Sequence, residues 1–383
     1  MEPMQESNGD LVYHYTTPAG LKGIIKDRCV WATNVNHLND ASEYQHGIDF
    51  IREEAAVREL HPEELAPAGS EVTKFMRDCA RAASIAMIQH HFQEKDYSRS
   101  VFAASFFVEP PRSTVSEEMS DAGDVLEQWR AYSQGGRGFS VGFDRYLLER
   151  RVSAKDPGTA NGKTACGNCI YDTEEKKSEV DEIFRCLAPA LFKLLQGSKK
   201  LVEELRHALA VELCGVADPS AITEIRHNSP LATAAYEAAV ERCHWTEELR
   251  PFMREMEKIF PDFAGRLIAL PALMKDPSFK TEREWRIIRF TVGAPSQIEF
   301  RTDKSGLVPY VEIPVSDTSD PSLITEGLIK RIVVGPFGSG TPRERDNAVA
   351  AIKMLLEKHR IRVQGPECPE GVLVQSSRVP LRA

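Results

Sequence analysis

The chain has 383 residues, with 48 Lys and Arg against 57 Asp and Glu, so its formal net charge is 48 − 57 = −9. This acidic balance argues against a protein that coats nucleic acid, because such a protein needs a basic face to neutralise phosphates. Hydrophobic residues make up 42% and charged residues 27% of the chain, a composition that excludes disordered and collagen-like proteins.

Residues 1–10 are polar and acidic, unlike a secretory signal, and the chain has no apolar run of the roughly 18 residues that a membrane span needs. The eight cysteines are too sparse for a disulfide scaffold. We therefore expect a soluble, cytoplasmic protein with reduced thiols. Cys166 and Cys169 form a C-x-x-C, but no second pair of ligands accompanies it. No metal site is predicted, and whether these two thiols bind a metal stays open.

The first third of the chain alternates strand and helix patterns. Apolar and β-branched runs predict strands at 11–15 and 30–33, with a helix starting at Pro18 between them. Asp40 stands three residues before Glu43, in the spacing of a capping box, and predicts a helix from 41 to about 60. A second helix is expected at about 70–94, and a buried strand at 100–108.

The rest of the chain divides into a helical block between β-rich segments. A helix at 124–132, a glycine-rich turn at 135–138, a strand at 139–143 and a loop at 153–169 precede the block, which extends from 174 to 270. Strands at 284–292, 298–301, 308–313 and 329–334, a helix at 342–359 and a last strand at 360–364 follow it. The pattern predicts an α+β domain in two parts, 11–173 and 271–375, with an all-helical insertion at 174–270 between them.

Two sequence segments carry chemistry suited to nucleotide binding. His14, Tyr15 and Thr16 end the first strand just before a helix, where an imidazole and hydroxyls can hold a ribose or a phosphate. Ser105 lies in an apolar strand beside Phe106 and Phe107, so its hydroxyl either serves a ligand or bonds a neighbouring carbonyl. In isolation, each segment is more often an ordinary part of a core.

A third segment holds two carboxylates. Glu282 and Glu284 enter a predicted strand at positions i and i+2, which places both side chains on one face about 7 Å apart. Such a pair can orient a hydroxyl and stabilise a developing positive charge. The alternative is a solvated strand end in which Glu and Arg alternate.

Further polar groups allow other readings. Arg130, between Trp129 and Tyr132 on one predicted helix, can clamp an anionic ligand, although the two rings also suit a core. Asn39, Asp40 and Glu43 form either a helix cap or part of a binding site.

In chain order, these motifs resemble the family called domain of unknown function 2971. The motifs are Tyr13-His14-Tyr15, Leu38-Asn39-Asp40 with Glu43, Ser105-Phe106, Trp129 with Tyr132, Gly138 to Asp144, Glu282 to Arg286, and Ile329 to Pro336. The resemblance covers roughly 11–375 without the helical block, and it implies no activity.

A more distant resemblance does imply an activity. His14-x-Thr16 followed by Leu21 and Ile24 is similar to the first motif of ADP-ribosyltransferases, Phe102–Ser105 to their second strand, and Glu282-x-Glu284 to their E-x-E. The sequence departs from that pattern in lacking a Tyr in the second motif, in the long spacing before the third, and in Arg286 after the acidic pair.

This second resemblance implies a split, twisted sheet with a central cleft for NAD⁺. In it, His14, Tyr15 and Thr16 hold the adenosine end, Ser105 supports the sheet edge, and Trp31, Phe106 or Phe107 stacks on nicotinamide. Arg130 contacts the cofactor, Glu284 is the catalytic carboxylate, and Glu282 orients or deprotonates the acceptor. The implied function is an ADP-ribosyltransferase or NAD glycohydrolase acting on an intracellular macromolecule, in a toxin or in phage defence.

Two alternatives stay open. In the first, the chain is a non-catalytic module that binds a nucleotide or a partner protein, and the 174–270 block is the interface. In the second, Asp40, Glu43 and the acidic pair bind Mg²⁺ in a nuclease, although no recognisable nuclease spacing is present.

Overall fold

A computed structural model describes residues 10–40, 42–66, 97–108, 121–153, 164–197, 263–291, 295–303, 306–315, 327–336 and 341–379, with single helical residues between 77 and 92. Most of the helix expected at 70–94 and residues 198–262 of the helical block lie outside this part of the chain. No helix among the described residues is long and apolar enough to cross a membrane.

The chain divides into two compact units. The first unit comprises residues 1–41, 98–169 and 275–383, and the second comprises 42–97 and 170–274. The described helices of the second unit are α2 (Glu43–Val57), α3 (Pro62–Leu65), α7 (Thr173–Gly197) and α11 (Phe263–Ala269). Within it, Arg58 pairs with Glu64 and Asp181 at 2.7 and 2.5 Å, which joins the end of α2 to α3 and α7.

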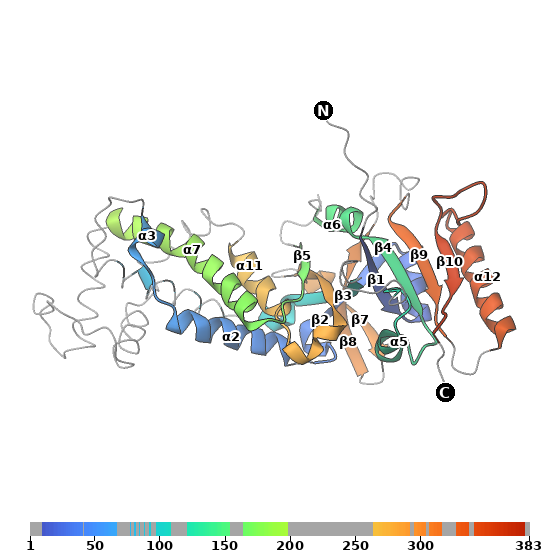
Figure 1. Cartoon of the computed structure of the whole chain (residues 1–383), viewed down its shortest axis with the longest axis horizontal. Coiled ribbons are helices and arrows are strands. Elements are labelled where there is room, and N and C mark those ends of the chain that lie inside the picture. Colours follow the sequence, from blue (N-terminus) through green and yellow to red (C-terminus); the bar gives the residue numbers. More distant parts are fainter. Residues whose placement is uncertain are drawn as a thin grey trace, which may run out of the picture. The chain divides into compact units, whose positions relative to one another are not determined.

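The first unit is built on a sheet of ten strands (Figure 1). The strands are β1 (Leu11–Thr16), β2 (Cys29–Asn34), β3 (Val101–Val108), β4 (Phe139–Asp144), β5 (Thr164–Asn168), β6 (Glu284–Phe290), β7 (Glu299–Asp303), β8 (Gly306–Pro314), β9 (Ile329–Val334) and β10 (Leu373–Ser376). Its helices are α1 (Pro18–Lys26), α5 (Leu126–Tyr132), α6 (Arg145–Ser153) and α12 (Pro342–Lys358).

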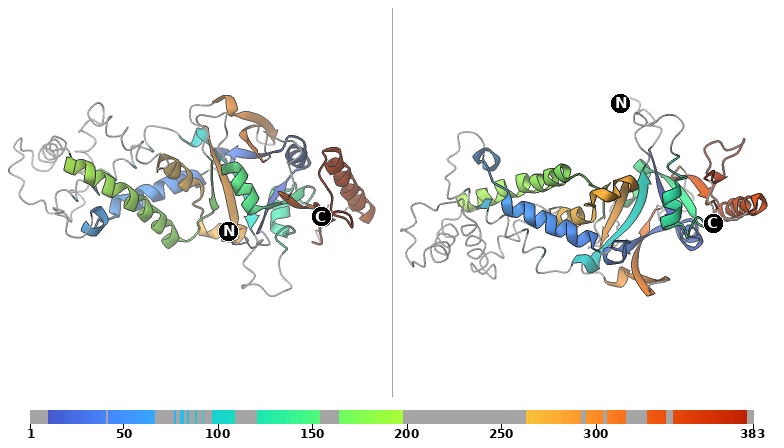
Figure 2. Two further views of the ribbon diagram at one scale, coloured as in Figure 1. Left: turned by 90° about the horizontal axis from the view of Figure 1, so that it is seen from above. Right: turned by 60° about the horizontal axis from the view of Figure 1, so that its bottom comes forward.

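The sheet is open and mostly antiparallel. Its main path runs β10-β9-β4-β1-β3-β2-β8-β7, and β6 pairs with β3 on one side and β5 on the other. Only the β10–β9 pair is parallel among the described strands. In the two further views of Figure 2, α12 lies at the β10 end of this unit, where it contacts β10 and β9.

Strand β3 is where the sheet divides. Strand β6 pairs along one edge of β3, from Val101 to Phe107. The other edge is shared, because β2 pairs at Phe102 and Ala103 while β1 pairs at Phe107 and Val108. Both β1 and β2 are antiparallel to β3 and are joined by α1, so they run parallel to each other and separate along residues 104–106 of β3.

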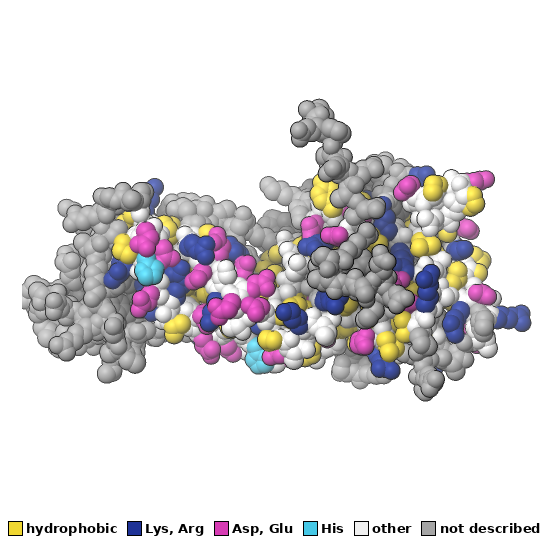
Figure 3. Space-filling model, in the orientation of Figure 1, with side chains coloured by type: hydrophobic (Ala, Val, Ile, Leu, Met, Phe, Trp, Pro, Cys, Tyr) yellow, Lys and Arg dark blue, Asp and Glu magenta, His cyan; other side chains and the backbone are white. Residues whose placement is uncertain are grey.

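Strand alternation sends side chains into cores on both faces of this sheet. Val12, Phe106 and Trp285 belong to the larger core, which also includes residues of α1, α6 and α12. Tyr13, Tyr15, Phe107 and Trp129 form a smaller core on the other face. On the surface shown in Figure 3, acidic and basic side chains are interspersed.

Several predicted elements need correction. The loop expected at 153–169 contains β5, which pairs with β6. The strand expected at 360–364 is wrong: Val363 makes only an isolated bridge to Val372, and the last strand is β10. Helix α2 begins at Glu43, two residues after the expected start at 41, and Ser42 before it makes no side-chain cap bond.

Candidate functional site

The point where β1 and β2 separate contains His14. Its Nδ1 lies 2.9 Å from the carbonyl oxygen of Ser105, within the stretch of β3 that neither β1 nor β2 pairs with. The imidazole also packs against Phe106, with ring centroids 5.3 Å apart. The side chain of His14 therefore occupies a position where a continuous sheet would have a backbone partner.

The hydrogen bond fixes the tautomer of His14. A carbonyl oxygen only accepts, so Nδ1 carries the proton and donates it. Burial lowers the pKa of His14, the bond to Ser105 partly offsets this, and the positive charge of Arg301 lowers it further. At neutral pH the imidazole is uncharged, and its Nε2 is an acceptor suited to a hydroxyl group.

The other side of Ser105 carries a charged cluster, which we define as Lys275, Glu282, Glu284 and Arg286. Glu284 and Arg286 are alternate residues of β6 and share one face of it. Arg286 Nε and Nη2 lie 2.7 and 2.6 Å from Glu284 Oε2. Lys275 Nζ contacts Glu282 Oε2 and lies 3.1 Å from Glu284 Oε1. The cluster sums to zero charge.

Neutral groups complete the surroundings of the two acids. Ser105 Oγ lies 3.4 Å from Glu284 Oε2, and Cys169 Sγ lies 3.7 Å from the same oxygen. Tyr132 donates to Glu282 Oε2 at 3.4 Å. Ser105 therefore contacts His14 through its carbonyl and Glu284 through its hydroxyl, so this one residue of β3 links the imidazole to Glu284.

Glu284 is ionised despite its burial. Only 6% of its side chain is exposed, and burial alone would raise its pKa, but Arg286 and Lys275 overcome this effect and lower the pKa. The neighbouring Tyr132 phenol responds in the opposite sense, because burial and the charges of Glu284 and Glu282 raise its pKa. Tyr132 thus stays a hydrogen-bond donor to the acids.

An aromatic patch lies on β2, β7 and β8, and we define it as Trp31, Thr33, Arg301 and Tyr310. The rings of Trp31 and Tyr310 are 4.8 Å apart, and the Arg301 guanidinium lies 5.8 Å from the Tyr310 ring centre. Arg301 Nη2 donates to Thr33 Oγ1 at 2.9 Å. All four side chains are partly exposed. Partly exposed rings beside a guanidinium can receive a planar, anionic ligand.

Trp31 also borders the separation of the strands. A Cβ added at Gly23 of α1 would lie only 3.4 Å from the Trp31 ring. Register places Thr33 opposite Ala103 of β3, two residues before Ser105, and beyond that pair β2 separates from β3. The aromatic patch therefore reaches β3 at Ala103 through Thr33, whereas the charged cluster contacts Ser105 through Glu284.

The other predicted site residues are buried in the cores, hydrogen-bonded to the backbone, or exposed on α5. Tyr15 is buried, and its hydroxyl donates to Ala122 O at 2.8 Å and accepts from Val125 N at 2.9 Å. Thr16 is buried under the first turn of α1, and Phe106 is 1% exposed inside the larger core. Arg130 is exposed on α5. Of the predicted site residues, His14 and Glu284 both contact Ser105, and Glu282 is joined to Glu284 through Lys275.

Trp129 and Tyr132 do not form the clamp expected around Arg130. Trp129 is fully buried and bonds Asp124, so it cannot stack on a ligand. Tyr132 instead contacts the charged cluster. Within the described chain, no three His, Cys, Asp or Glu side chains are grouped to hold a metal ion. Burial raises the pKa of Cys166, in the C-x-x-C, to about 12.

Lowering the pH from 7 to 5 is expected to destabilise the protein through His14. Its pKa is lowered on folding, so between that value and about 6.5 the unfolded chain binds a proton that the folded chain does not. Stability therefore rises with pH across this window, by at most about 1.4 kcal/mol per pH unit, and levels off above it.

Urea unfolding at each pH measures this slope. His14→Asn keeps an amide donor for Ser105 and should flatten the slope, while the exposed His37→Asn should retain it. An unchanged slope in His14→Asn would show that other groups cause the acid sensitivity.

Comparison with known families supports one of the two resemblances. Residues 128–287 match the family model described as "Protein of unknown function (DUF2971)". The match extends from α5 to β6 and so includes Tyr132 and all four residues of the charged cluster. No curated protein and no solved structure matches the chain.

Proposed function

We propose that this protein is an NAD⁺-dependent ADP-ribosyltransferase or NAD glycohydrolase whose substrate binds across Ser105. The observation that carries the proposal is that Ser105 contacts both the neutral His14 and the ionised Glu284 where β1 and β2 separate. These two groups offer a hydroxyl acceptor and a negative charge within the span of one dinucleotide.

The residues fit the chemical parts of NAD⁺. His14 Nε2 would accept a hydrogen bond from the adenosine ribose, and the partly exposed Trp31 ring would stack on a planar ring of the dinucleotide. Arg301, over the neighbouring Tyr310 ring, would supply a cation for a phosphate. Glu284 would accept the 2′-hydroxyl of the nicotinamide ribose.

Glu284 is also suited to the chemical step. The bond from ribose C1′ to nicotinamide breaks, nicotinamide leaves, and C1′ bonds an oxygen or nitrogen of the acceptor, which loses a proton. The Glu284 carboxylate stabilises the positive charge that develops on the ribose, an effect of about 3–4 kcal/mol for a well-placed group. Glu282, with 24% of its side chain exposed, would orient the acceptor and take the proton. Water as acceptor gives hydrolysis.

The ion pairs of Glu284 favour a second candidate. Arg286 and Lys275 already balance the two acids, and such a neutral, buried arrangement also suits a non-catalytic module that binds NAD⁺ without cleaving it. For catalysis, Lys275 or Arg286 must shift its contact from the acids to the substrate diphosphate. Nicotinamide release separates the two candidates.

The test is nicotinamide release from NAD⁺ by the purified protein, with and without a cell lysate as acceptor source. The double substitution Lys275→Met with Glu284→Gln removes one charge of each sign and keeps the cluster neutral. We expect it to lower the rate by about 10²–10³-fold. A matched control, Lys353→Met with Glu357→Gln on the exposed face of α12, should retain the rate.

Two outcomes would count against the transferase. Equal release by the double variant would remove Glu284 from the reaction. Calorimetric binding of NAD⁺ without any release by the wild type would establish the binding module instead. Toxicity on expression in bacteria, lost in the double variant, would support the proposed role against an intracellular macromolecule.

A further inference from the structure

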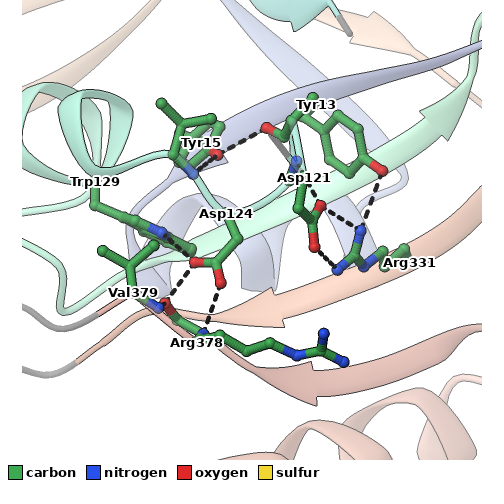
Figure 4. A network of polar contacts seen from close by, with 12 residues as sticks. Tyr13, Tyr15, Asp121, Asp124, Trp129, Arg331, Arg378 and Val379 are labelled. Atoms are coloured by element: carbon green, nitrogen blue, oxygen red, sulfur yellow. Dashed lines mark hydrogen bonds and ion pairs between the residues drawn. The ribbon is translucent and has the colours of Figure 1, made fainter. Parts of the chain in front are cut away.

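A second polar network lies beside the site and is centred on Asp124 (Figure 4). Its Oδ1 accepts from Trp129 Nε1 at 2.8 Å and from Ser377 Oγ, and its Oδ2 accepts from the backbone N–H of Arg378 at 2.6 Å. Asp124 is 9% exposed, so these bonds replace water around a buried carboxylate. Asp124 thus joins α5 to the segment that follows β10.

The segment that carries Asp124 is held at two more points. Tyr15 Oη donates to Ala122 O and accepts from Val125 N, which ties the segment to β1. Asp121 pairs with Arg331 of β9, whose Nη1 lies 2.6 Å from Asp121 Oδ1. Figure 4 shows both contacts beside Asp124. The segment before α5 is therefore fixed to two strands of the sheet.

Helix α5 depends on such anchors because it has only seven residues. A helix this short is not stable alone in water. Trp129, in its middle, is fully buried, packs edge-on against Tyr15 at 4.8 Å, and bonds Asp124. Three residues later, on a neighbouring part of the helix surface, Tyr132 donates to Glu282.

We propose that Asp124 is a positioning residue for the charged cluster. By holding Trp129, Asp124 sets the placement of α5 and hence the contact of Tyr132 with Glu282. The C-terminal segment Ser377–Val379 belongs to the same support, because Ser377 and Arg378 bond Asp124 and Val379 N bonds Ser377 Oγ at 3.1 Å. The kinetic part of this inference rests on the proposed function, whereas its structural part does not.

Hydrogen exchange tests the structural part without any activity. In Asp124→Asn, an amide NH₂ group takes the place of the carboxylate oxygen that accepts from the backbone N–H of Arg378. The NH₂ group cannot accept, so this hydrogen bond is lost. We expect amides of 126–133 and 377–379 to exchange at least tenfold faster in this variant. Glu127→Gln, at an exposed position of α5, should leave the exchange within twofold of wild type. Unchanged exchange of 126–133 in Asp124→Asn would overturn the proposal.

Nicotinamide release tests the coupling to the site. Asp124→Asn and Tyr132→Phe should lower kcat by similar factors, with a smaller change in KM, and the double variant should lose no more than the more affected single variant. Multiplicative effects would show that Asp124 acts on stability rather than through Tyr132. Absence of release by the wild type would refute the proposed function, while the exchange result would still decide the role of Asp124.

Discussion

Replacing Glu284 with Gln is expected to lower the free energy of unfolding by about 3–5 kcal/mol. The amide removes the negative charge that balances Arg286 and Lys275, whose side chains are 3% and 5% exposed. Two buried cations would then share one remaining acid, Glu282. Chemical denaturation followed by circular dichroism measures the loss.

If the lost charge balance causes this instability, a second substitution that removes a cation should restore part of the stability. Adding Lys275→Met to Glu284→Gln removes one of the two buried cations and should recover a large part of the lost stability, since neutral replacements of buried pairs are often tolerated. Glu357→Gln on exposed α12 should change stability by less than about 0.5 kcal/mol. A double variant as unstable as Glu284→Gln alone would contradict this account and point to lost hydrogen bonds.

Replacing Phe106 with Ala is also expected to lower the free energy of unfolding by about 3–5 kcal/mol. Phe106 is 1% exposed and contacts three rings, with centroids 5.3 Å from His14, 5.8 Å from Phe143 and 5.2 Å from Trp285. The cavity would lie directly against the imidazole, so the pH dependence assigned to His14 should weaken as well.

Thermal or urea unfolding of Phe106→Ala across pH 5–7 measures both effects. Phe300→Ala is a matched control, because Phe300 is 61% exposed on β7 and its loss should change stability little. A small loss of stability in Phe106→Ala would mean that the neighbouring rings close the cavity.

Strands and helices with a clear period could be predicted from the sequence. Alternating or β-branched runs gave β1, β2, β4 and β9 within about a residue or two, and a Pro start with apolar spacing gave α1 and α12. Strand β5, Thr164–Asn168, was missed because Thr-Ala-Cys-Gly-Asn reads as a loop, and it extends only by pairing with β6. Similarly, β10 depends on its parallel partner β9.

The division of the sheet could not be read from local pattern. It arises because one edge of β3 is shared by β1 and β2, a long-range choice of partners that no short window records. The sequence did point to His14, Ser105, Glu282 and Glu284, through motifs in and beside predicted strands. The structure links His14 and Glu284 through Ser105, and a role of these residues in catalysis stays a proposal.

The basic residues that neutralise the two acids also show that local sequence pattern does not reveal long-range contacts. Arg286 could have been assigned to Glu284, because alternate strand residues share a face. Lys275 had no such signal, because it precedes the 3-10 helix Pro277–Glu282 and meets Glu282 and Glu284 only once that helix has formed. The patch around Tyr310 and Arg301 likewise depends on the pairing of β2 with β8 and of β8 with β7.

The pairing of β3 with β6 has a consequence for biosynthesis. Strand β3 ends at Val108 and β6 ends at Phe290, so 290 − 108 = 182 residues must leave the ribosome after β3 before its long edge is covered. At about 5–20 residues per second, this takes roughly 10–35 s. During that time the nascent chain presents an apolar, unpaired strand edge, a surface that chaperones shield and that other unfinished chains can join.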